Sequence, residues 1–165
     1  MRDGPLEAED VEGAPTRLRW PWILGTAFTV VGFGISAYLT YEHFTGSSTL
    51  ACPSGPRSIV NCLEVTTSPW SVQWGIPVAV LGLVFFAVML PLQSAPAWRT
   101  PRLSVHGARV VWCVAGVVSV LRLLYFELAR IHAICEWCTA VHLVTFLLFA
   151  STVLGVGQVL AYRDG

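Results

Sequence analysis

The stretch that decides the fold runs from Glu136 to Ala161 and reads EWCTAVHLVTFLLFASTVLGVGQVLA. It contains no Asp, Glu, Lys or Arg after Glu136, and it exceeds the roughly 20 mostly apolar residues that a helix needs to cross a bilayer. None of the apolar runs alternates as a strand of a membrane barrel would. The sequence therefore predicts an all-α integral membrane protein, a bundle of four transmembrane helices. The other three runs are Trp22 to Phe44, Gly75 to Gln93 and Gly107 to Ala129.

The composition agrees with a bilayer environment. Hydrophobic residues make up 55% of the chain and charged residues 12%, whereas a soluble domain carries about 25% charged residues. The mean hydropathy is +0.64, which excludes an ordinary water-soluble domain and a disordered chain. The formal net charge is zero, so the chain lacks the basic surface that nucleic-acid binding requires.

Arginine placement predicts the orientation of the bundle, because positive residues accumulate on the cytoplasmic side. We expect both chain ends in the cytoplasm and a long extracytoplasmic loop over residues 45–74. Residues 1–19, rich in acidic residues, Gly and Pro, predict a disordered cytoplasmic tail before a membrane domain over residues 20–163. The predicted cytoplasmic side carries Arg17, Arg19, Arg99, Arg102 and Arg163, against Arg57 and Arg130 on the other side.

Four of the five cysteines fall on the predicted extracytoplasmic face, in two pairs. Cys52 and Cys62 lie in the long loop, and Cys135 and Cys138 form the C-E-W-C at the start of the fourth helix. Cys113 lies inside the third helix, where we expect it to pack as a small apolar residue.

Three interpretations of the four outer cysteines remain open: structural disulfides, a zinc site of four thiolates, and a dithiol relay. An oxidising compartment disfavours zinc, and a disulfide across two residues closes too small a loop to stabilise much. A helix N-terminus lowers a thiol pKa, so the relay is favoured. Cys138 lies one turn deeper than Cys135, where a lipid-soluble quinone can reach it, while a soluble partner can reach Cys52.

Several motifs together resemble the vitamin K epoxide reductase (VKOR) family in its bacterial form. They are S-A-Y-L-T-Y-E-H from Ser36 to His43, N-C-L-E-V-T-T-S from Asn61 to Ser68, G-I-P-V-A-V-L-G from Gly75 to Gly82, and the C-E-W-C itself. The resemblance covers about residues 32–144.

The resemblance implies a four-helix bundle around a quinone pocket. It implies that Cys52 and Cys62 pass electrons from a thioredoxin-fold, DsbA-like partner to Cys135 and Cys138, and that Ser68 supports the active site. The expected order is attack of the partner on Cys52, attack of Cys62 on Cys135, and release of Cys138 as a thiolate beside the quinone.

The residues that would hold the quinone differ from those of vertebrate members, which use an Asn early in the second helix and a Tyr four residues after the last cysteine. Here those places read Pro77-Val78-Ala79 and His142. Pro77 and His142 are therefore the candidate quinone contacts, with helix packing as the alternative for His142. Arg122 and Glu127 lie in the outer half of the third helix, and Arg122 either extends toward the interface or pairs inside the bundle.

The expected function is that of a thiol-disulfide oxidoreductase of the bacterial inner membrane, with ubiquinone or menaquinone as co-substrate and no metal. The unrelated quinone reductase DsbB carries its C-x-x-C in the first outer loop, the reverse of the order here. The alternative is a non-catalytic four-helix membrane scaffold with structural disulfides, which would not need a C-x-x-C entering the fourth helix.

Overall fold

A computed structural model describes residues 19–46, 51–52 and 59–164. The tail expected over residues 1–19 lies outside this range except for Arg19, and so do residues 47–50 and 53–58 of the expected loop. The elements in chain order are α1 (Arg19–Thr45), α2 (Cys62–Thr67), η3 (Pro69–Ser71), β1 (Val72–Gln73), β2 (Ile76–Pro77), α3 (Val78–Gln93), α4 (Ala95–Arg99), α5 (Leu103–Phe126), the π-helical turn η4 (Glu127–Ile131) and α6 (Glu136–Asp164).

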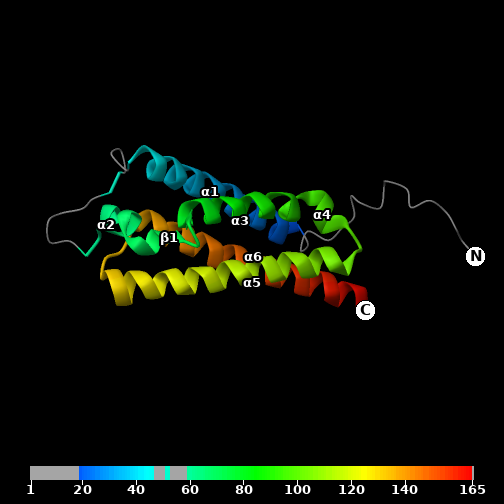
Figure 1. The fold of residues 1–165 in the computed structure, drawn as a ribbon. Coiled ribbons are helices and arrows are strands. Elements are labelled where there is room, and N and C mark those ends of the chain that lie inside the picture. Colours follow the sequence, from blue (N-terminus) through cyan, green and yellow to red (C-terminus); the bar gives the residue numbers. More distant parts are fainter. Residues whose placement is uncertain (1–18, 47–50, 53–58, 165) are drawn as a thin grey trace, which may run out of the picture.

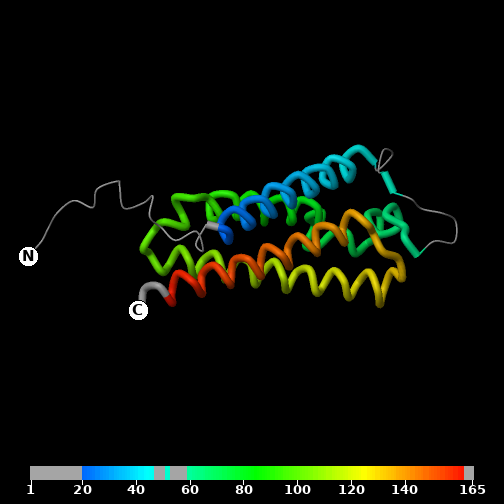
Figure 2. Tube along the Cα trace, turned by 180° about the vertical axis from the view of Figure 1, so that it is seen from behind, coloured from blue at the N-terminus to red at the C-terminus, as the bar shows by residue number. Residues whose placement is uncertain are grey.

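Four long helices of alternating direction form the body of the protein (Figures 1 and 2). Helix α1 packs against α3 and α6, and α5 packs against α6 and α3. Glycines allow the close approaches: a Cβ on Gly32 of α1 would collide with the Phe86 ring of α3, and one on Gly116 of α5 with the Phe85 ring. A Cβ on Gly34 of α1 would have nothing within 4 Å. Of Gly32 and Gly34, only Gly32 therefore lies where a neighbouring helix comes close.

Three of the described helices are long and apolar enough to cross a bilayer. The described residues therefore form an all-α membrane protein. Many large apolar side chains lie on the outside of the bundle, as expected where lipid is the solvent. The three spans are Trp20–Thr45, Leu103–Ile131 and Glu136–Ala161.

Helix α3 is shorter than the run from Gly75 that the sequence suggested. Its 16 residues span about 24 Å, against a hydrocarbon core of about 30 Å. Trp74 and Gly75 adopt positive φ and turn the chain between β1 and β2, which pair antiparallel. Pro77 therefore lies in β2, directly before α3, and not in the first turn of a helix.

A network of buried polar side chains surrounds the C-terminal end of α3. The Gln93 side chain donates to Thr152 Oγ1 (2.6 Å) and accepts from the Trp98 indole (2.9 Å). The guanidinium of Arg109, fully buried, donates from Nε to the Leu92 carbonyl (2.8 Å) and lies 3.8 Å from the Trp98 ring centroid. Helix α3 ends inside the apolar interior, where its last carbonyl groups have no partner within the helix. These contacts supply hydrogen-bond partners for such polar groups there.

Candidate active site

The loop cysteines form a disulfide. Cys52 and Cys62 are bonded, with Cα atoms 6.1 Å apart. Cys62 is fully buried and begins α2. Asn61 caps this short helix by accepting a hydrogen bond from the Glu64 backbone N–H at 3.2 Å. The other three cysteines carry free thiols.

Two sets of contacts hold the loop against the start of α6. Val60 and Ile134 form a parallel bridge in which the Asn61 N–H donates to the Ile134 carbonyl at 3.0 Å. Beside Cys52, the Trp137 indole donates to the Ala51 carbonyl at 2.7 Å. As a result, Cys62 and Cys135 belong to one buried cluster, with Cys52 and Cys138 packed against it.

Within the C-E-W-C, the two thiols lie in different surroundings. Cys135 is fully buried just before α6, and Cys138 is half-buried in the first turn. The Cys138 backbone N–H donates to the Cys135 sulfur at 3.3 Å. A hydrogen bond from the Cys138 thiol lowers the pKa of Cys135, and backbone N–H groups add to this, although burial and the charge of Glu127 oppose it. Cys135 is thus the thiol that ionises more readily.

No group of three or more His, Cys, Asp or Glu side chains in the described ranges is arranged to hold a metal ion. Two of the four thiols that the zinc interpretation required are joined to one another in the Cys52–Cys62 disulfide.

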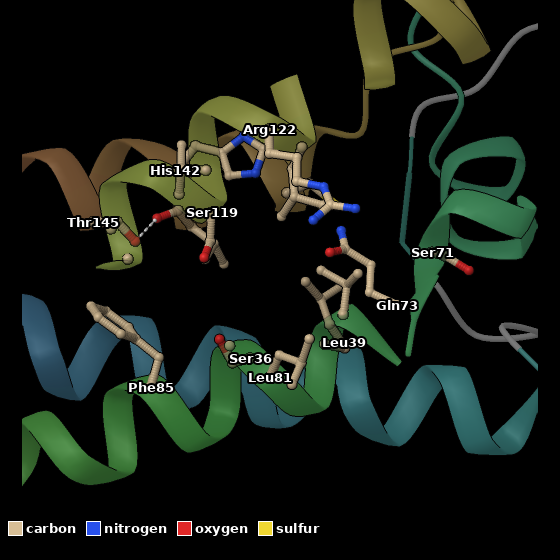
Figure 3. Close-up of a pocket in the computed structure, with 18 of the residues that line it drawn as sticks. Ser36, Leu39, Ser71, Gln73, Leu81, Phe85, Ser119, Arg122, His142 and Thr145 are labelled. Atoms are coloured by element: carbon tan, nitrogen blue, oxygen red, sulfur yellow. Dashed lines mark hydrogen bonds between the residues drawn. The ribbon is translucent and has the colours of Figure 1, made fainter. Parts of the chain in front are cut away.

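A cavity of about 460 Å³ lies beside Cys138, between the α1–α3 and α5–α6 layers. Cys138 lines it and Cys135 does not. In Figure 3 the His142 ring and the Arg122 guanidinium extend over the cavity opposite Ser36 and Leu39. The walls are mainly apolar, and the volume is in the range of small-molecule sites. The aromatic lining residues are Trp70, Trp74, Phe85, Phe86, Trp112 and Phe126.

Ser68 lies where the loop covers the cavity. It ends α2 and precedes η3, and its hydroxyl donates to the Val65 carbonyl at 2.9 Å. The Ser71 hydroxyl donates to the Ser68 carbonyl at 2.7 Å. Ser68 and Val65 both line the cavity, so Ser68 shapes the short helix that forms its cover.

The two candidate quinone contacts differ in position. His142 lines the cavity and is 4% exposed. Its Nδ1 has no hydrogen-bond partner within the described residues. Pro77 is not among the lining residues, whereas its neighbours Val78 and Ala79 are. Pro77 lies in β2, directly before the first residue of α3.

Three residues matter here more than the sequence indicated. Glu127 is buried and lines the cavity, whereas the sequence marks it only as a charge that interrupts an apolar run. Gln73 reaches the cavity from β1 and points toward Arg122 (Figure 3). Trp137 fixes the loop. A Trp between two cysteines and a lone Glu in an apolar helix were visible signals, but their contacts depend on tertiary packing.

A comparison with protein-family models matches residues 22–153 to the vitamin K epoxide reductase family. The chain belongs to this family. Membership supports a membrane oxidoreductase of the thiol-disulfide type, and the family implies a redox partner and a quinone in the membrane. The match covers every motif on which the resemblance rested, and it favours an oxidoreductase over a membrane scaffold.

Proposed function

We propose that this VKOR-family protein oxidises a thioredoxin-fold, DsbA-like partner and passes the two electrons to a membrane quinone, ubiquinone or menaquinone. The observation that carries the proposal is the position of Cys138. Its thiol lines the apolar cavity, and its partner Cys135 belongs to the same buried cluster as Cys62 of the disulfide. Such an arrangement links a dithiol at the loop to a lipid-soluble acceptor.

The proposed exchange runs through the buried cluster. The exchange begins with Cys135 and Cys138 joined as a disulfide, the oxidised form of the thiols that are free in this structure. A partner thiolate attacks Cys52 and frees Cys62, which attacks Cys135 and releases Cys138 as a thiolate at the cavity. The second partner thiol then displaces Cys52, which recombines with Cys62 and frees Cys135, and the two protons of the partner dithiol end on Cys135 and Cys138. Thiol–disulfide exchange needs a thiolate and access to sulfur. The packing of Cys62 with Cys135 supports the second step, and the half-buried state of Cys52 supports the first.

The cavity is the proposed quinone site. Its volume and aromatic walls suit a flat apolar ring, and the unpartnered Nδ1 of His142 suits a quinone oxygen. Ser68 acts by holding the cover formed by α2 and η3. Pro77 lies directly before α3, so it acts in this proposal by fixing where the wall formed by Val78 and Ala79 begins.

The proposed arrangement in the membrane has one domain over residues 20–163. It has four spans, including the short α3, and both chain ends in the cytoplasm of a bacterial inner membrane. In this arrangement residues 1–19 lie on the cytoplasmic side and residues 45–74 on the extracytoplasmic side. Membrane-impermeant thiol reagents applied to intact, reduced cells should then label Cys52 or Cys62. Labelling only after the membrane is breached would reverse the orientation.

The decisive experiment follows both half-reactions with the purified protein. Oxidation of a DsbA-like dithiol and reduction of a soluble quinone should proceed at equal rates, and Cys138→Ala should stop quinone reduction. Dithiol oxidation without quinone reduction, or neither reaction, would overturn the proposal.

A further inference from the structure

Glu127 differs from the other buried polar groups at this end of the bundle. The residue is 4% exposed. Within the part of the chain that the structure describes, its carboxyl group makes no hydrogen bond or ion pair. Burial of an unpaired carboxyl group costs stability, and such groups in native proteins usually have a functional explanation.

The position of Glu127 connects the thiols with the cavity. It begins the π-helical turn η4 that joins α5 to the segment before the C-E-W-C, and such turns are frequent at functional sites. Glu127 lines the same cavity as Cys138. Cys138 in turn packs against the buried cluster that contains Cys135.

We propose that Glu127 carries protons between the C-E-W-C thiols and the acceptor bound in the cavity. The inference rests on the proposed quinone-coupled function and extends it to proton transfer. A positioned carboxyl group is a common proton-transfer group in enzymes.

The transfer is balanced without any proton from solvent. When the Cys135 and Cys138 sulfurs join, the two thiols lose two electrons and two protons, and all of these end on the quinone as quinol. The proton from the Cys135 thiol moves to the Glu127 carboxylate as the sulfur–sulfur bond forms. It then moves from Glu127 to a quinone oxygen, so Glu127 ends in its starting state. The proton of Cys138 reaches the second oxygen.

Other ionisable side chains that line the cavity fit this role less well. They are His43 of α1, Arg122 of α5 and His142 of α6. The Arg122 guanidinium lies 5.3 Å from the Trp74 ring centroid and 5.5 Å from that of Phe126, and it does not give up its proton at physiological pH. His142 is already assigned to a quinone oxygen, and Glu127 lies in the turn η4 that leads into the C-E-W-C.

The first test is a single turnover of the reduced protein with a soluble quinone. Glu127→Gln, which keeps the size of the side chain but cannot carry a proton in this way, should slow quinone reduction by about 10²-fold. Glu127→Asp should restore much of the rate. The matched control is Glu136→Gln, which removes an exposed carboxyl group next to Cys135 in sequence and outside the cavity lining; its rate should equal that of the wild type.

The second test needs no quinone. In a Cys113→Ala background with the Cys52–Cys62 disulfide intact, Cys135 and Cys138 are the remaining thiols. Their thiolate absorbance is followed against pH. Glu127→Gln should move thiolate formation to lower pH because a nearby negative charge is gone, whereas Glu127→Asp should stay close to the parent protein.

The outcomes separate this inference from the function on which it rests. A wild-type protein that reduces no quinone overturns the proposed function. A Glu127→Gln protein that reduces quinone at the wild-type rate, or titrates like its parent, overturns the role of Glu127 alone. If the Glu127→Gln protein fails to insert into the membrane, Glu127→Asp and Glu127→Ala are compared instead. Equal rates of quinone reduction in these two proteins would also overturn the inference.

Discussion

The two ends of the bundle differ in whether their buried polar side chains have hydrogen-bond partners. At the Arg109 end, formed by α4, the end of α3 and the start of α5, buried groups bind one another. Gln93 contacts Trp98 and Thr152, and Arg109 binds the Leu92 carbonyl. Among the described residues at this end, Arg109 Nη2 and Gln158 Oε1 are the buried atoms without a hydrogen-bond partner. At the cysteine end, formed by α2, η3, η4 and the start of α6, Glu127 and the Nδ1 of His142 face a cavity with no such partner.

Buried polar side chains that are paired stabilise the fold, whereas those without a partner are available for a reaction. Paired polar groups rigidify a protein interior, and the Arg109 end uses them to complete the short α3. Unpaired buried groups reduce stability and are retained where a ligand or a reaction uses them. Substitutions at the Arg109 end should therefore change stability, and those at the cysteine end should change reactivity.

The largest expected effect is covalent trapping at the cysteine end. In Cys52→Ala, no Cys52 thiol is present to attack the Cys62–Cys135 disulfide. Cys62 should therefore remain joined to Cys135. A protease site at Pro101, in the segment between α4 and α5, separates the two cysteines after cleavage. Without reductant the halves should migrate together on a gel, and with reductant they should part.

Adding Cys135→Ala to this protein should abolish the link. Halves that stay joined through Cys138 would mean that Cys135, and not Cys138, faces the acceptor. That outcome would contradict the assignment of the cavity thiol.

The next largest effect concerns the Arg109 end. Arg109→Met keeps most of the side-chain volume but leaves the Leu92 carbonyl and His106 without their partner and removes the stacking on Trp98. The free energy of unfolding should fall by about 3 kcal/mol, measured by thermal or denaturant unfolding in detergent. Quinone reduction per folded molecule should be unchanged.

Arg122→Met is the matched control, on the same helix but exposed and over the cavity. Its unfolding should match the wild type. Equal destabilisation by both substitutions would remove the contrast between the two ends.

A smaller effect is expected from His142→Phe, which removes the hydrogen bond proposed for a quinone oxygen. The KM for quinone should rise about tenfold, corresponding to about 1.4 kcal/mol. Thermal stability should not fall, because Nδ1 has no partner to lose within the described residues. Steady-state kinetics over a range of quinone concentrations measure the change. A loss of stability with an unchanged KM would make His142 a packing residue.

The smallest effect is expected from Cys113→Ala. Cys113 is 1% exposed and packs with Phe86, Met89 and Leu148, and its thiol makes a weak contact with Thr152 Oγ1 at 3.7 Å. Unfolding measurements should show a loss of about 1 kcal/mol, and electron transfer should stay intact. Complete inactivity in a folded protein would add a fifth thiol to the relay.

The sequence by itself determined the features that depend on local composition and spacing. An apolar run sets a membrane helix because lipid cannot satisfy free backbone groups, so α1, α5 and α6 were predictable within a few residues. The place of Cys138 one turn beyond Cys135 follows from helix periodicity. The motifs around both cysteine pairs were sufficient to indicate the VKOR family.

Tertiary structure decided what depends on contacts between distant segments. The shortening of α3 required the turn at Trp74 and the network around Arg109, which no apolar run reveals. The packing of Cys62 on Cys135 depends on the bridge between Val60 and Ile134. Glu127 and Cys138 share a cavity because separate helices pack around it, and sequence spacing within any one helix does not encode that packing.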